Sequence, residues 1–432
     1  MTTLLVFAAI LLLYGIVSRP LDKRGVTSAL VFTVVGLAVG TAGLELIEVK
    51  LESAVAETIT EIALVLLLFS DAARLDLVEL RRHRAWPSRL LLVGLPLTLI
   101  LGTGAGLLVF PGMALASAFL LSTMLASTDA ALGQRVVSDE AVPDRVRQAL
   151  DVESGLNDGL AVPFFLVAVD IAHAELTTGF TWAVVWNAAE QVGWGLVAGV
   201  GAGALGGLLY RQAAGRGWLE GMWRQIVPLA VALLAFAAAI ALGGSGFIAA
   251  FVGGMAFGYV SRERELSATY FTEQAGDLVA AAVWIGFGAA ALAWAAPHVT
   301  WQVVVYALLS LTVVRMLPVA IAFWRTGARP QTVAFIGWFG PRGLASIVFA
   351  LLALEEAVPD STTLLTTVVV TVALSVLAHG LTSAPLVGVY QRWYATHADE
   401  HPGSVEAAPT ALPRSRRPLA ASGSRVLRRA DD

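Results

Sequence analysis

The feature that most constrains this chain is a series of long apolar runs separated by short polar loops. A helix needs about 20 mostly apolar residues to cross the hydrocarbon core of a bilayer, which is about 30 Å thick. Thirteen runs approach that length, near residues 3–18, 26–43, 54–70, 90–110, 112–131, 147–171, 181–209, 222–242, 246–260, 269–294, 299–325, 331–355 and 362–391. The sequence therefore predicts an all-α polytopic membrane protein with about thirteen transmembrane helices.

Composition agrees with this reading and excludes several classes of protein. Of the 432 residues, 57% are hydrophobic and only 14% are charged, whereas a soluble domain carries about 25% charged residues. Such a deficit excludes a soluble enzyme or a nucleic-acid-binding protein. The chain has no cysteine, which excludes disulfides and thiolate metal sites. We expect neither a cofactor nor a nucleic-acid partner.

The basic residues predict which side of the membrane each loop faces. If thirteen spans alternate sides, all but three of the 28 Lys and Arg residues fall in one set of loops and in the C-terminal segment. The exceptions are Lys50, in an opposite loop, and Arg315 and Arg342, inside predicted spans. Because Lys and Arg concentrate in cytoplasmic loops, we expect the N-terminus outside and the C-terminus in the cytoplasm.

The predicted topology contains two groups of six spans with opposite orientation. Such inverted repeats are typical of transporters, and their corresponding members here are the runs 112–131 and 331–355. Both contain an interruption: polar Ser127-Thr128-Asp129 in the first, and Gly340-Pro341-Arg342-Gly343 at the middle of the second. Broken helices at matching positions of two halves indicate an ion or substrate site near the bilayer midplane.

The run 147–171 carries the chemistry of the predicted site. Glu153 with Asn157, and Ser154 with Asp158, are i,i+4 pairs, so four polar side chains share one helical stripe. A carboxylate at that depth costs several kcal/mol unless it meets water, a cation or a partner. Clustered oxygens without nitrogen or sulfur ligands suit a hard monovalent cation. Asp158 is therefore our candidate for a site shared by a cation and a proton.

The two intramembrane arginines need partners. Arg342 beside Asp158 would keep that aspartate charged and unable to take up a proton, so we predict that Arg342 pairs with Glu153 instead. A purely structural bridge between Asp158 and Arg342 is the alternative. We expect Arg315 to anchor its span to a cytosolic carboxylate. Glu273 and Asp277 either line a cytoplasmic entry funnel or form a solvated helix end.

Several motifs in fixed order resemble the monovalent cation:proton antiporter-1 family. They are Thr128-Asp129, Glu153-Ser154 with Asn157-Asp158-Gly159, Gly246-Phe247-Ile248-Ala249-Ala250-Phe251, Gly340-Pro341-Arg342-Gly343 and His379-Gly380-Leu381-Thr382. The resemblance implies a membrane domain over 1–395, with spans four to six and eleven to thirteen as a mobile core in which spans five and twelve are unwound and cross. Spans one to three and seven to ten would form the interface of a homodimer, and 396–432 would be a disordered cytoplasmic tail.

The resemblance also assigns roles to site residues. It implies that the cation is bound by Asp158, Asp129, Ser154 and the backbone of Thr128, with Glu153 close by and with Asn157 and Arg342 as core partners. Asn157 before Asp158 resembles the electroneutral branch, in which one proton exchanges for one cation. Ala130 is a departure, since many relatives have proline after the Thr-Asp pair.

The sequence thus predicts a transporter of the cell membrane, not an enzyme. It would exchange a monovalent cation, most simply Na⁺ but also Li⁺ or K⁺, for H⁺ by alternating access. A K⁺-selective proton antiporter is the first alternative and a cation channel is the second, although no filter-like repeat is present. An intramembrane hydrolase using Ser154 or Ser245 with His379 lacks a recognisable base and oxyanion hole.

Overall fold

The computed structural model describes residues 2–47, 53–75, 85–177, 182–261, 268–400 and 405–407, and every regular element among them is helical. The longer elements are α1 (Thr2–Lys23), α2 (Ser28–Val39), α3 (Ala54–Arg74), α6 (Leu95–Val109), α7 (Leu115–Met124), α8 (Ala130–Ser138), α9 (Asp144–Thr177), α10 (Trp182–Gly215), α11 (Trp223–Ala241), α12 (Gly246–Ser261), α13 (Tyr270–Gly286), α15 (Trp301–Leu311), α16 (Val313–Ala322), α17 (Pro330–Trp338), α18 (Leu344–Glu355) and α19 (Ser361–Glu400). Short pieces extend some of them, namely α5 (Ala85–Arg89) and η1 (Leu90–Gly94) before α6, and η2 (Phe287–Ala291), α14 (Leu292–Ala295) and η3 (Ala296–His298) after α13.

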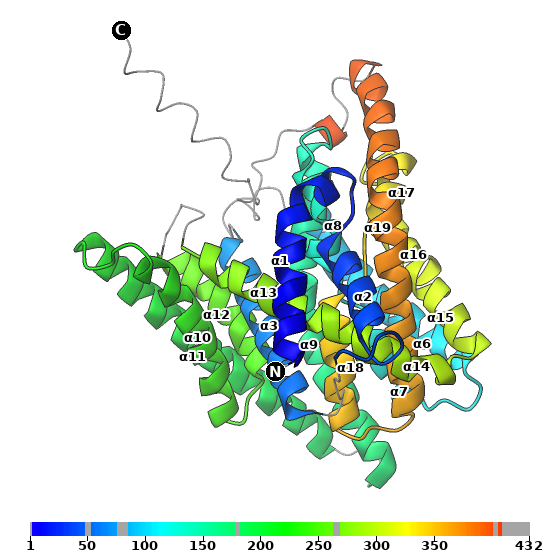
Figure 1. Cartoon of the computed structure of the whole chain (residues 1–432), viewed down its shortest axis with the longest axis horizontal. Coiled ribbons are helices and arrows are strands. Elements are labelled where there is room, and N and C mark those ends of the chain that lie inside the picture. The colour runs from blue at the N-terminus through cyan, green and yellow to red at the C-terminus, as the bar shows by residue number, and fades with distance from the viewer. Residues whose placement is uncertain are drawn as a thin grey trace.

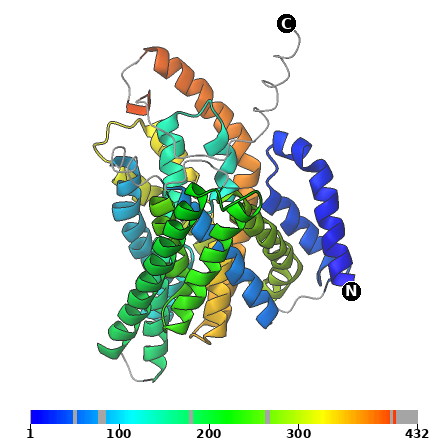
Figure 2. The ribbon, with the colours of Figure 1, turned by 90° about the vertical axis from the view of Figure 1, so that its left-hand side faces the viewer.

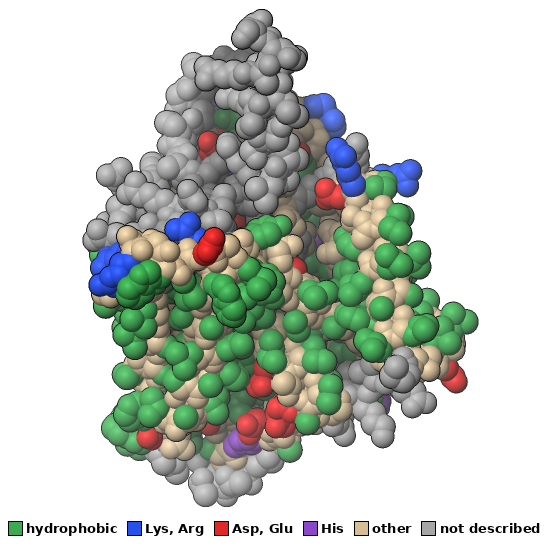
Figure 3. Space-filling view, turned by 60° about the vertical axis from the view of Figure 1, so that its left-hand side comes forward, with side chains coloured by type: hydrophobic (Ala, Val, Ile, Leu, Met, Phe, Trp, Pro, Cys, Tyr) green, Lys and Arg blue, Asp and Glu red, His purple; other side chains and the backbone are tan. Residues whose placement is uncertain are grey.

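The helices have the length and composition of membrane spans. Among the described residues, 8 helical stretches are long and apolar enough to cross a bilayer, and four shorter apolar helices (α2, α7, α12 and α18) accompany them. This confirms the predicted all-α membrane architecture. The number thirteen and the inverted repeat stay predictions. In Figure 3, hydrophobic side chains form a broad band, and the visible Lys and Arg side chains lie toward one end of the molecule.

The helices gather into two groups, which lie side by side in Figure 1 and one in front of the other in Figure 2. One group contains α3 and α10 to α13, and its helices pack with their backbones almost in contact. A Cβ on Gly203 would stand 2.1 Å from the carbonyl oxygen of Gly253, and a Cβ on Gly254 would stand 2.4 Å from that of Phe69. Small residues at such crossings let membrane helices approach closely. The second group contains α6 to α9 and α15 to α19.

Two helices of the second group are broken in the middle, as predicted. The first break separates α7 from α8, and the second separates α17 from α18. The two breaks are in contact where they cross: the backbone N–H of Asp129 donates to the carbonyl of Pro341 over 2.8 Å. Gly343 lies at the crossing, where a Cβ would stand 2.0 Å from Oδ2 of Asp129.

The C-terminal segment departs from its predicted boundary. The last helix continues to Glu400 rather than ending near residue 395, and Val405–Ala407 form a further turn, η4. Arg145 donates through Nη1 to the carbonyl of Val405 over 2.9 Å, and Glu406 Oε1 accepts the backbone N–H of Arg329 over 2.8 Å. Residues 408–432, predicted to be disordered, lie outside the described residues.

Candidate ion-binding site

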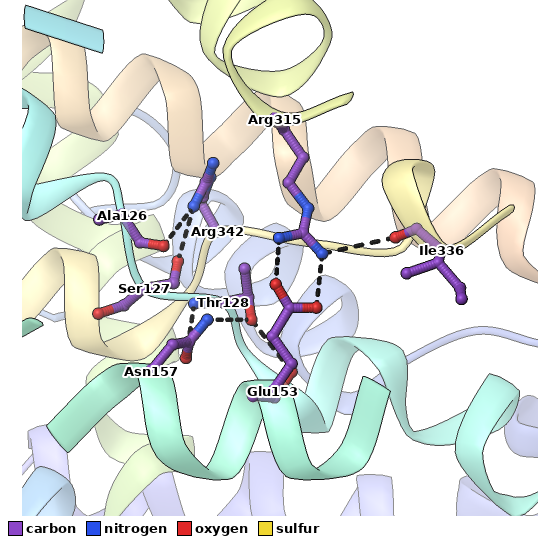
Figure 4. Close-up of polar contacts among 9 residues, drawn as sticks. Ala126, Ser127, Thr128, Glu153, Asn157, Arg315, Ile336 and Arg342 are labelled. Carbon is purple, nitrogen blue, oxygen red and sulfur yellow. Dashed lines mark hydrogen bonds and ion pairs between the residues drawn. The ribbon is translucent and has the colours of Figure 1, made fainter. Parts of the chain in front are cut away.

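Helix α9 presents the predicted polar stripe to the first helix break. Glu153, Ser154 and Asn157 are buried, whereas Asp158 keeps partial access to solvent. Figure 4 shows Glu153 and Asn157 reaching from α9 toward the loop between α7 and α8. The stripe therefore faces the helix crossing rather than lipid.

Thr128 fastens this loop to α9. Its Oγ1 accepts a hydrogen bond from Nδ2 of Asn157 over 2.7 Å and lies 3.1 Å from Oγ of Ser154. Its backbone N–H lies 3.4 Å from Oδ1 of the same asparagine. These bonds, several of which are drawn in Figure 4, fix the unwound segment beside the carboxylates of α9. Asn157 thus links α9 to the unwound segment through its side-chain amide.

Asp129 joins the two broken helices at their crossing. Its Oδ1 accepts the backbone N–H of Leu132 over 3.3 Å, in the first turn of α8, and its Oδ2 accepts that of Leu344 over 3.0 Å, at the start of α18. A carboxylate at a helix N-terminus satisfies N–H groups that have no intrahelical partner and interacts favourably with the helix dipole. Asp129 does this for two half-helices at once.

The predicted partners of the two arginines are wrong. Arg315, rather than Arg342, pairs with Glu153: its Nη1 contacts Oε1 and its Nη2 lies 2.8 Å from Oε2. Arg315 therefore binds a carboxylate inside the bundle and not a cytosolic one. Both side chains are buried, and Figure 4 shows the paired orientation.

Arg342 instead binds backbone carbonyls at the first helix break. Its Nη1 donates to the carbonyl of Ala126 over 2.8 Å and to that of Ser127 over 3.2 Å, and its own backbone N–H donates to Oγ of Ser375 over 2.7 Å. The carbonyls follow the C-terminus of α7, where helical partners are missing and the dipole is negative, so a cation is favourable there. The guanidinium of Arg342 therefore neutralises the exposed carbonyls at the end of α7 and does not pair with Glu153.

Asp158 lies at the centre of this arrangement without an arginine. Its Oδ1 is buried and has no hydrogen-bond partner among the described residues. Two other carboxylates, Asp129 and Asp71, interact with it electrostatically. A buried carboxylate oxygen among like charges is costly unless a proton or a cation neutralises it. The geometry therefore suits alternate occupation by either one.

Comparison with known proteins identifies the family. The family described as sodium/hydrogen exchanger, transmembrane, matches residues 6–389. The chain belongs to this exchanger family. It is 28% identical over 425 residues to the K(+)/H(+) antiporter NhaP of Alkalimonas amylolytica, covering 93% of this chain and 68% of that protein. It is 25% identical over 287 residues to a Na(+)/H(+) antiporter of Schizosaccharomyces pombe, covering 60% of each.

A solved structure shares the fold of this exchanger. The sodium proton antiporter MjNhaP1 from Methanocaldococcus jannaschii, determined at pH 8, superposes with a TM-score of 0.71 at 19% identity. The match covers 87% of this chain and 98% of that one. The predicted family and fold are therefore confirmed.

One acidic residue of the exchanger's site was missing from the sequence prediction. Asp71 lies on α3, where its Cβ is 3.8 Å from the position of a Cβ on Gly155, one helical turn before Asp158. Its place one residue beyond the run 54–70 made it look like an ordinary helix end. Asp71 comes after Ser70 and the apolar stretch 62–69, and an acidic side chain so close to the end of such a stretch is the signal that could have identified it.

The predicted funnel residues differ in their surroundings. Glu273 is buried on α13 and pairs with Arg74 of α3, whereas Asp277 is exposed. His379 lies between α17 and α19, with Nε2 2.9 Å from the carbonyl of Trp338 and Nδ1 2.8 Å from that of Ser375. These contacts place His379 in the packing between the two helices. Ser154 bonds to Thr128 and not to this histidine, so no serine–histidine pair is formed there.

Proposed function

We propose that this exchanger carries a monovalent cation and a proton in opposite directions across the cell membrane, one for one, with Asp158 as the shared site. Na⁺ is the first candidate for the cation. K⁺ is the second, because relatives named for K⁺ and for Na⁺ exchange both resemble the chain.

The observation that carries the proposal is how the neighbouring acids are engaged. Glu153 is bound by Arg315, and both carboxylate oxygens of Asp129 accept backbone N–H groups. Asp158 has no such partner for its buried Oδ1. A single carboxylate whose charge is neutralised by either H⁺ or a cation gives a one-for-one exchange that moves no net charge.

The ligands in this proposal combine hard oxygen donors from α9 and from the helix crossing. They are Asp158, Asp129, Ser154 and the backbone carbonyl of Thr128, with Glu153 close by. Carboxylate, hydroxyl and carbonyl oxygens are the donors that alkali cations accept, whereas soft or nitrogen ligands suit transition metals. Asn157 and Arg342 serve as partners that hold the crossing in place.

Alternating access would come from movement of one group of helices against the other. Rocking of one bundle around a site near the midplane is the usual mechanism in transporters with broken helices. The group with α9 and the crossing would move, and the group with α3 and α10 to α13 would form a homodimer interface. The proposed orientation in the membrane places the N-terminus outside and the C-terminus in the cytoplasm. Glu273 and Asp277 would then lie toward the cytoplasmic entrance.

Exchange by the purified protein in proteoliposomes tests the proposal. An imposed pH gradient should drive uptake of radioactive Na⁺ against its own gradient, and Asp158→Asn should abolish this uptake. Asp360→Asn, a change of the same kind at an exposed loop residue, should leave uptake unchanged. Full exchange by the Asp158→Asn variant would contradict the proposal, and flow of Na⁺ without proton coupling would indicate a channel.

A further inference from the structure

Helix α3 carries a carboxylate to the ion site but is attached to the opposite group of helices. A Cβ on Gly258 of α12 would stand 2.2 Å from the carbonyl oxygen of Ala73, and a Cβ on Gly276 of α13 would stand 3.1 Å from Leu67. These close contacts tie α3 to α12 and α13. Asp71 therefore lies on a helix packed closely against α12 and α13, and the proposed movement of the two groups would change its distance from Asp158.

Asp71 is placed to act on the cation as it reaches Asp158. Its side chain packs at Gly155 and acts electrostatically on Asp158, yet it retains 23% exposure. A carboxylate that is partly wet and close to the site attracts a cation from the aqueous side. Its effect depends on whether its charge is cancelled by a neighbour.

The neighbour that could cancel this charge is Arg74, three residues further along α3. Its Nη2 lies 3.7 Å from Oδ1 of Asp71, which is a loose contact. The same guanidinium contacts Glu273 of α13 more closely: its Nη1 donates to Oε1 over 2.9 Å, and its Nη2 lies 2.8 Å from Oε2 as an ion pair. A charge-assisted hydrogen bond of this length is stronger than a 3.7 Å contact, so Arg74 is held by Glu273 rather than by Asp71. Both partners are mostly shielded, at 14% and 10% exposure.

We propose that Glu273 is a positioning residue that keeps Arg74 on α13 and thereby leaves the charge of Asp71 available to the cation entering the site. The inference rests on the proposed exchange function. Glu273 contacts neither Asp158 nor the cation in this scheme and acts only through the arginine.

Loss of Glu273 has a specific consequence in this arrangement. Residues three apart on a helix are neighbours, so a released Arg74 would fork onto Asp71 and neutralise it. Glu273→Gln should therefore raise the apparent KM for Na⁺ roughly three- to tenfold with little change in kcat, as expected for removing one charge near a partly solvated site. Asp71→Asn should raise KM at least as much. Because the mechanism passes through the arginine, Arg74→Gln together with Glu273→Gln should restore most of the wild-type KM.

Initial rates of Na⁺-driven proton movement in everted membrane vesicles, measured over a range of Na⁺ concentrations, test this inference. Glu220→Gln, an exposed acid in the loop between α10 and α11, is the matched control and should keep the wild-type KM. Adding Glu273→Gln to Asp71→Asn should raise KM no further, because the charge that it controls is already gone.

Two results would overturn the inference. One is a fall in kcat at unchanged KM in Glu273→Gln, which would indicate a packing role. The other is a double variant of Arg74 and Glu273 with the same raised KM as Glu273→Gln. Neither result contradicts the proposed exchange function, which is tested separately by exchange in the wild-type protein and its loss in Asp158→Asn. The two proposals can therefore be rejected independently.

Discussion

At the scale of single residues, Glu153 and Arg315 form a buried ion pair that joins α9 to α16. The acidic stripe on α9 could be predicted from its i,i+4 spacing, because an intramembrane carboxylate needs a reason to be there. The choice between two arginines could not, because it depends on the path of the unwound loop. That path brings Arg342 to the carbonyls of Ala126 and Ser127 and leaves Glu153 to Arg315.

Removing one charge of this pair should lower the free energy of unfolding strongly, whereas removing both charges should lower it only a little. Glu153→Gln leaves a buried arginine without a counter-charge, which costs about 3–5 kcal/mol of stability. Removing both charges with Arg315→Gln should recover most of that loss. Denaturant unfolding in detergent micelles measures both free energies. Additive losses in the double variant would show that the two side chains do not depend on each other.

At the scale of elements, the crossing of the two broken helices depends on the absence of a side chain at Gly343. Polar residues within one apolar run and a Gly-Pro interruption within the other were sufficient to predict the two breaks. Contact between the breaks, and the sharing of Asp129 by α8 and α18, follow from tertiary packing and have no signature in local sequence.

Gly343→Ala should damage the crossing. The added methyl group would stand 2.0 Å from Oδ2 of Asp129, so the carboxylate must leave the N-terminus of α18. We expect a loss of about 1–3 kcal/mol of stability, as for overpacking elsewhere, together with loss of exchange. Gly104→Ala on α6, where a Cβ meets nothing within 4 Å, is the control. Equal behaviour of the two variants in thermal unfolding and transport would contradict the described crossing.

The turn η4 makes a second prediction at this scale. Glu406 is 1% exposed, and its carboxylate accepts hydrogen bonds from the N–H of Arg329 and the hydroxyl of Thr332 at the N-terminus of α17. Glu406→Ala should therefore cost about 1–2 kcal/mol, the range for loss of a helix cap. The rate of amide hydrogen exchange in α17 should rise in this variant. It should stay unchanged in Glu140→Ala, which alters an exposed acid in the loop between α8 and α9. Equal protection of α17 in the two variants would show that the turn does not hold this helix.

At the scale of the whole molecule, the distribution of arginines predicts the orientation in the membrane. The positive-inside rule places the loop between α10 and α11 in the cytoplasm and the loop between α18 and α19 outside. Because the chain has no cysteine, single cysteines report their own side. In intact cells, a membrane-impermeant maleimide should label Asp360→Cys and not Arg216→Cys. The reverse pattern would invert the topology.

The central claim is that Asp158 holds either a proton or a cation, and proton release on cation binding tests it most directly. Na⁺ added to the purified protein in weakly buffered detergent solution should release about one proton for each cation bound, as the one-carboxylate scheme requires. Asp158→Asn should release none. Cation binding to the wild-type protein without proton release, or undiminished release from Asp158→Asn, would contradict the account.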